Sequence, residues 1–89
     1  MIKIFDKKIK KGDVYAVQTG DYVGEMLIFV DDDPEFYMFL STPKMVNREI
    51  PKDKFDIGKQ NEIIEYVETL PKDVFKVVKK QFEANRDKL

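Results

Sequence analysis

Two short segments in the first half of the chain carry apolar residues at both odd and even positions. They are residues 22–30 and residues 36–41. Because successive side chains of a strand point to opposite faces, each segment predicts a strand that is apolar on both faces and covered on both. One face holds Met26, Ile28, Val30, Phe36, Met38 and Leu40, and the other holds Leu27, Phe29, Tyr37 and Phe39.

An acidic turn separates these two predicted strands. It reads Asp31-Asp32-Asp33-Pro34-Glu35. Proline fixes φ and acidic residues are poor strand formers, so we expect an antiparallel hairpin here. A shorter strand at residues 14–17 precedes the hairpin, and a more polar strand at residues 45–50 follows it. Gly24 predicts a bulge or a sharp bend in the second strand.

The pattern of residues 61–70 is compatible with two assignments. As a strand, the segment does not separate polar from apolar side chains. As a helix it carries one apolar stripe, with Asn61 as a plausible N-cap. We favour the helix, whose stripe consists of Ile63, Ile64, Val67 and Leu70. The preceding residues 52–58 predict either one helical turn or a loop.

A final helix is predicted after Pro71, since proline suits the first turn of a helix and disfavours helical geometry at the residue before it. Its apolar stripe consists of Val74, Val78 and Phe82, with Phe75 beside them. Such a stripe could dock a partner helix, but it more often packs on the protein's own sheet. We expect the last residues, 85–89, to fray.

This order of elements predicts one α+β domain spanning residues 1–89. Residues 1–12 form a basic segment, residues 13–50 a β-meander and residues 51–89 a helical part with two helical elements. The covered strands allow either a small antiparallel SH3-like barrel or a curled sheet with helices on one face and a partner on the other. The arrangement of the first sixty residues is similar to that of many SH3-like barrels, although it carries no motif that implies a ligand.

Composition removes most catalytic chemistry. The chain has no cysteine and no histidine, so it lacks the usual nucleophilic thiol, the commonest general base and the commonest metal ligand. We therefore expect no enzyme, no catalytic residue, no cofactor and no metal. No apolar run approaches the length of a membrane span, and the N-terminus lacks the pattern of a signal peptide, so we expect a soluble, cytoplasmic protein without membrane contact.

Charge is strongly segregated although the net charge is only -1. Residues 13–40 contain seven acidic residues and neither lysine nor arginine. The acidic turn at residues 31–35 could bind a hard cation, but its spacing lacks the EF-hand pattern, and a solvated hairpin turn is the ordinary interpretation.

Lysines gather in the first twelve residues and again around residues 44–54. Such a patch could track a phosphate backbone, although arginine is scarce and the total charge is negative. The ordinary interpretation is protection of an edge strand. The candidate phosphate contacts are Lys7, Lys8, Lys10, Lys11, Lys44 and Arg48, with Lys52 and Lys54 nearby.

Aromatic residues near the turns are candidates for partner contact, because aromatic side chains are enriched at interfaces as well as in small cores. They are Tyr22, Phe36, Tyr37 and Phe39. We therefore expect a small non-enzymatic interaction or regulatory domain, such as an accessory protein of a bacterium or phage, that binds another protein or a second copy of itself. The alternatives are a nucleic-acid-binding small barrel and a structural or assembly module that is stable only as an oligomer.

Overall fold

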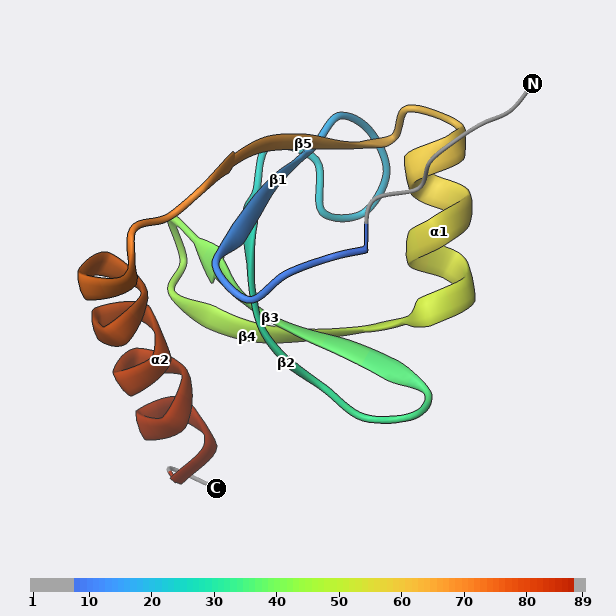
Figure 1. The fold of residues 1–89 in the computed structure, drawn as a ribbon. Coiled ribbons are helices and arrows are strands. Elements are labelled where there is room, and N and C mark those ends of the chain that lie inside the picture. Colours follow the sequence, from blue (N-terminus) through green and yellow to red (C-terminus); the bar gives the residue numbers. More distant parts are fainter. Residues whose placement is uncertain (1–7, 88–89) are drawn as a thin grey trace.

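A computed structural model describes residues 8–87 and shows a sheet with two helices (Figure 1). Within this range there are five strands and two helices, which confirms the α+β class. The elements are β1 (Asp13–Val17), β2 (Met26–Asp32), β3 (Phe36–Thr42), β4 (Val46–Pro51), α1 (Lys52–Gln60), β5 (Ile64–Thr69) and α2 (Lys72–Asp87).

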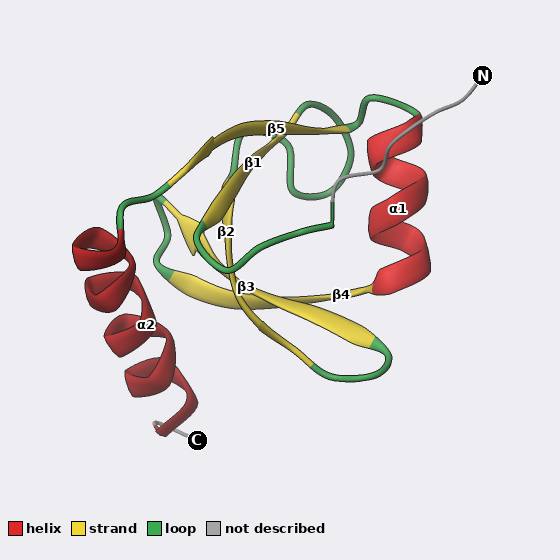
Figure 2. Ribbon diagram, viewed as in Figure 1, coloured by secondary structure: helices red, strands yellow, loops and turns green. Residues whose placement is uncertain are grey.

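All five strands form one antiparallel sheet in the order β4-β3-β2-β1-β5 (Figure 2). The outermost strands, β4 and β5, do not pair with each other within residues 8–87. The sheet is therefore not closed into a barrel, which was one of the two expected arrangements. The other, with both helices on one face, is wrong as well, because α1 and α2 pack on opposite faces. Instead of a direct turn, the nine-residue helix α1 connects β4 to β5, and its Phe55 is completely buried in the core on one face of the sheet.

The predicted hairpin around the acidic turn is confirmed, with β2 antiparallel to β3. The extent of β2 differs from the expectation. The strand starts at Met26 and continues through Asp32, while Gly24 lies before it in the β1–β2 loop with a φ of 87°. The irregularity in the pairing falls instead between Phe29 and Asp31. Gly24 therefore serves the loop, where a positive φ is required, rather than a bulge within the strand.

One apolar face of the sheet packs against α1. Its buried residues include Leu27 from β2 and Phe39 from β3, neither of which is exposed at all. Phe55 from α1 completes this core, with ring centroids 5.1 Å from Tyr15 and 5.3 Å from Phe39. This face holds the odd-numbered apolar residues of the two central strands, as the alternation predicts.

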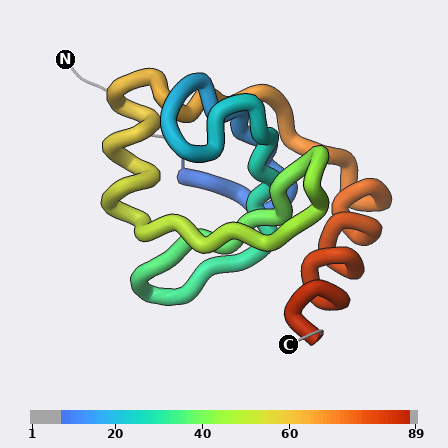
Figure 3. The backbone as a smooth tube through the Cα atoms, turned by 180° about the vertical axis from the view of Figure 1, so that it is seen from behind, coloured from blue at the N-terminus to red at the C-terminus, as the bar shows by residue number. Residues whose placement is uncertain are grey.

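The opposite face packs against α2. Val78 and Phe82 of this helix are buried in a second cluster with strand residues such as Ile28 and Leu40. Figure 3 shows α1 and α2 at opposite ends of the molecule. Both apolar faces of β2 and β3 are thus covered within one chain. The apolar stripe of α2 packs on its own sheet as expected, except that Val74 is 42% exposed.

The helix predicted for residues 61–70 is wrong, because this segment forms β5. Helix α1 ends just before it in a turn where Glu62 has a φ of 62°, the Ile63 N–H donates to the Gly58 carbonyl and the Glu62 N–H donates to the Lys59 carbonyl. This is the hydrogen-bond pattern of a helix-terminating Schellman motif. The chain then leaves in an extended conformation and pairs with β1.

A bulge interrupts the alternation of side chains in β5 and hides its strand pattern in the sequence. The register shifts between Val14 and Tyr15, which pair with Glu68 and Tyr66, so Val67 is the extra residue. An extra residue reverses the alternation of side chains between the two faces. Residues 51–89, which were expected to be helical, thus contain the strand β5 between the two helices. Residues 52–58, expected to form one helical turn or a loop, belong to the nine-residue helix α1.

The ends of the chain add two observations. Asn85 belongs to α2 and its side-chain amide donates to the Met45 carbonyl and to the Asn47 side chain, both at 3.0 Å, so fraying does not begin at residue 85. Within residues 8–87, neither helix has the length and apolar character needed to cross a membrane.

Candidate functional site

Strand β5 is the most exposed strand of the sheet. Among the residues that the structure describes, its one strand neighbour is β1. Ile64 is buried, whereas all five following residues are exposed, with Tyr66 at 50% and Val67 at 45%. By contrast, β4 at the other edge is mostly half-buried and contacts both helices, whereas β5 contacts α1. An edge strand presents backbone donors and acceptors that can pair with another chain.

A buried carboxylate holds the C-terminal end of β5 against β1. Asp13 is 6% exposed, and it accepts hydrogen bonds from the Thr69 hydroxyl at 2.6 Å and from the Lys10 backbone N–H at 2.9 Å. The hydroxyls of Thr69 and Tyr66 lie 2.7 Å apart. Burial, with a further contribution from Asp13, raises the pKa of the Tyr15 phenol. These contacts fix β5 in position.

The side chains around this strand are acidic. Residues 60–71 contain three glutamates, Glu62, Glu65 and Glu68, and neither lysine nor arginine. All three are exposed, and the Glu65 carboxylate accepts a hydrogen bond from the Gln18 side chain at 3.1 Å. Natural edge strands are commonly protected by charged side chains, above all lysine, by proline or by β-bulges. Strand β5 has the bulge at Val67 and two glutamates but neither lysine nor proline. Its acidic edge disfavours another acidic strand and is compatible with pairing to a basic segment.

An apolar cavity of about 230 Å³ lies beside the N-terminal end of β5. The β1–β2 loop, the end of β4 and the start of β5 surround it. Core side chains line it together with the half-buried Tyr22, whose ring lies 4.4 Å from the Arg48 guanidinium carbon. Its lining residues are Val17, Thr19, Gly20, Asp21, Tyr22, Leu27, Ile50, Ile63 and Ile64.

The four aromatic residues predicted to contact a partner are not brought together. Tyr22 lines the apolar cavity, whereas Phe36 lines a surface hollow at the tip of the hairpin with Pro34 and Pro51. Tyr37 is half-buried against the core beneath α1, and Phe39 is not exposed at all. Only Tyr22 therefore lies near β5.

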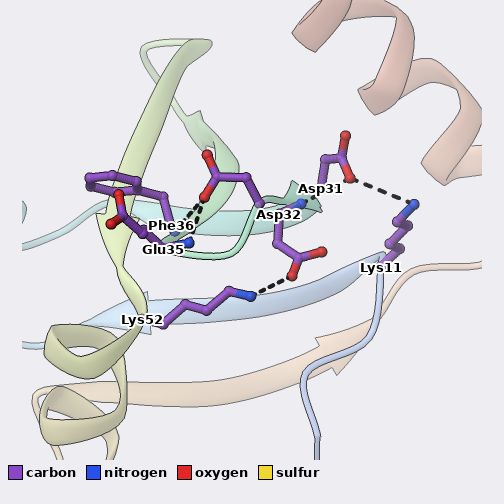
Figure 4. A network of polar contacts seen from close by, with 7 residues as sticks. Lys11, Asp31, Asp32, Glu35, Phe36 and Lys52 are labelled. Atoms are coloured by element: carbon purple, nitrogen blue, oxygen red, sulfur yellow. Dashed lines mark hydrogen bonds and ion pairs between the residues drawn. The ribbon is translucent and has the colours of Figure 1, made fainter.

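The acidic turn is occupied by contacts within the chain (Figure 4). Lys11 lies 3.8 Å from Asp31, and Lys52 lies 2.7 Å from Asp32. The Asp33 carboxylate accepts backbone hydrogen bonds from residues 35 and 36 at 2.8 and 2.7 Å, which lower its pKa. Residues 8–87 contain no group of three or more acidic side chains arranged to hold a metal ion.

The predicted phosphate contacts are largely paired with acids. Arg48 forms a two-pronged ion pair with the buried Glu25, and Lys44 lies 3.9 Å from the same carboxylate. These bonds, above all that from Arg48, lower the pKa of Glu25. Lys11 pairs with an acid in the turn described above, while Lys8 and Lys10 are exposed. Lys7 lies outside the described residues.

Sequence reasoning missed β5 and its glutamates, because it assigned their segment to a helix. One signal was present in the sequence. The run from residue 60 to residue 71 is the longest stretch after residue 40 without a positive charge, and a helix needs no such depletion.

Comparisons of the chain with protein-family models, with curated proteins and with solved structures found no match.

Proposed function

We propose that this protein is a non-enzymatic interaction domain that binds an extended, basic segment of another protein along the edge of β5. The observation that carries the proposal is an edge strand with five consecutive exposed residues, acidic side chains and no protecting lysine or proline. Addition of a strand to a sheet edge obtains its affinity from main-chain hydrogen bonds. The glutamates would favour lysine or arginine on the incoming segment.

The same geometry disfavours a second copy of the chain as the partner. Pairing two β5 strands would bring Glu65 and Glu68 of one copy near the same residues of the other, and like charges across strands are destabilising. Both apolar faces of the sheet are also covered by α1 and α2. An oligomer is therefore not needed to bury them.

Two further features favour binding over catalysis. Within residues 8–87, every buried side-chain nitrogen and oxygen atom has a hydrogen-bond partner. The buried carboxylates Asp13 and Glu25 are both engaged by several donors. Nucleic-acid binding through the lysine-rich segments stays an alternative proposal, with less support because Lys44 and Arg48 are paired with Glu25.

The test uses a labelled peptide of alternating lysine and valine, eight residues or so in length, with binding followed by fluorescence anisotropy. We expect saturable binding to the wild-type protein. The double variant Glu65→Lys, Glu68→Lys should bind about tenfold more weakly, because two attractions of roughly 0.2–1 kcal/mol each become repulsions. The matched control Glu83→Lys, at an exposed position of α2, should bind as the wild type does.

Two additional peptides separate strand addition from general charge attraction. The same sequence with every backbone nitrogen methylated keeps its charges and loses its donors, so it should not bind. A glutamate-valine peptide should not bind either. Equal binding of the methylated peptide, or equal loss in the Glu83→Lys control, would contradict the proposal.

A further inference from the structure

The apolar cavity beside β5 is open to solvent and is built from core residues. Leu27 and Val17 belong to its lining, and they are 0% and 8% exposed. Ile50 and Ile63 are half-buried and lie on either side, from β4 and from the turn directly before β5. The cavity therefore lies where the sheet fails to close, between its two outermost strands.

The size of the cavity fits one ring-sized apolar group. Cavities of about 150 Å³ lined by aliphatic residues bind benzene, and this cavity has a volume of about 230 Å³. Arg48 holds the Tyr22 wall by lying over its ring, and Arg48 is itself held by Glu25. The cavity wall is therefore preorganised before any ligand arrives, which lowers the cost of binding.

The surroundings of the cavity add a charge preference. Asp21 belongs to the lining, and Glu62 and Glu65 directly flank the lining residues Ile63 and Ile64 in the sequence. The Glu65 carboxylate accepts a hydrogen bond from Gln18, the residue that follows β1. An apolar pocket with an acidic rim is complementary to an apolar residue flanked by basic residues.

We propose that the cavity is the specificity pocket of the β5 edge, and that it accepts a phenylalanine side chain of the basic segment paired with β5. This inference rests on the proposed function, because the position of the side chain depends on strand addition. In strand addition, main-chain hydrogen bonds supply affinity and pockets beside the edge select side chains.

The experiment compares the lysine-valine peptide with versions in which one valine at a time is replaced by phenylalanine. At one position near an end of the peptide, phenylalanine should tighten binding about tenfold, since it removes a ring from water. Thr19→Phe, at an exposed lining residue, should fill the pocket and abolish this gain, so that the phenylalanine peptide and the all-valine peptide bind this variant equally.

The control is Val23→Phe, at a 58% exposed position of the same loop that does not line the cavity, and it should keep the gain. Ile63→Ala, which removes part of one wall, should reduce the gain, so the result does not depend on one variant folding. If phenylalanine gives no gain in affinity at any position while the all-valine peptide binds, the pocket proposal fails and the proposed function stands. If no peptide binds, the proposed function itself fails.

Discussion

At the scale of single residues, the structure depends on two buried carboxylates with complete sets of partners. Asp13 joins β1 to β5, and Glu25 joins the β1–β2 loop to β3 and β4 through Ser41 and Arg48. A buried charge is costly unless it is paired and hydrogen-bonded. Neither role was predicted from the sequence, because seventeen acidic residues give no indication of which will be buried.

The Glu25 site predicts a dependence of stability on pH. Its pKa lies below the ordinary value of 4.5, mainly because of the hydrogen bond from Arg48. A lowered folded-state pKa stabilises the fold above the unfolded-state value, and this stabilisation is lost as the pH falls through the folded-state value. Stability of the wild-type protein should therefore decrease below about pH 4.5.

The variant Glu25→Gln isolates this contribution. Near neutral pH it should lower the free energy of unfolding by about 1.5–3 kcal/mol, since the partly buried Arg48 guanidinium loses its charged hydrogen-bond partner. Urea unfolding at neutral and acidic pH measures the effect. The difference from the wild type should shrink in acid, while Glu83→Gln should change stability little at either pH. A difference that stays constant would show that Glu25 acts through packing rather than charge.

At the scale of elements, the alternation in the sequence predicted β2 and β3 well and β5 poorly. The central strands β2 and β3 are apolar on both faces and buried on both. Their apolar runs therefore predict a strand without any knowledge of which strands they pair with. In β5 only Ile64 is buried, and the bulge at Val67 removes the alternation. Its strand conformation comes from pairing with β1, which no local pattern specifies. The candidate site was missed for the same reason.

The boundary between α1 and β5 carries a prediction of its own. Glu62 adopts a φ of 62° at the end of α1, a conformation that favours glycine over residues with a Cβ atom. Glu62→Gly should therefore raise the free energy of unfolding by about 0.5–1 kcal/mol. The control Glu83→Gly, inside α2, should lower it by about 1 kcal/mol. Urea unfolding distinguishes the two, and destabilisation by Glu62→Gly would mean that the turn is assigned wrongly.

At the scale of the whole molecule, one short chain covers both faces of its sheet and leaves one edge exposed within the described residues. Helix α1 covers one face and α2 the other, and these contacts leave β5 as the exposed edge. The two-sided cover could be expected from the central strands alone. Which of the two edge strands would stay open could not be expected, because it depends on α2 packing on β2, β3 and β4, while α1 contacts β4 and β5 alike. The case for a partner therefore rests on the edge of the sheet and not on surplus apolar surface.

Amide hydrogen exchange of β5, measured residue by residue with and without the lysine-valine peptide, tests this account most directly. In the free protein, the backbone N–H groups of β5 that point away from β1 should exchange rapidly, while those bonded to β1 should be protected. The peptide should protect the outward groups, and the double variant Glu65→Lys, Glu68→Lys should need about tenfold more peptide for the same protection. Outward groups that are already protected in the free monomer, or that the bound peptide leaves unprotected, would contradict an open binding edge at β5.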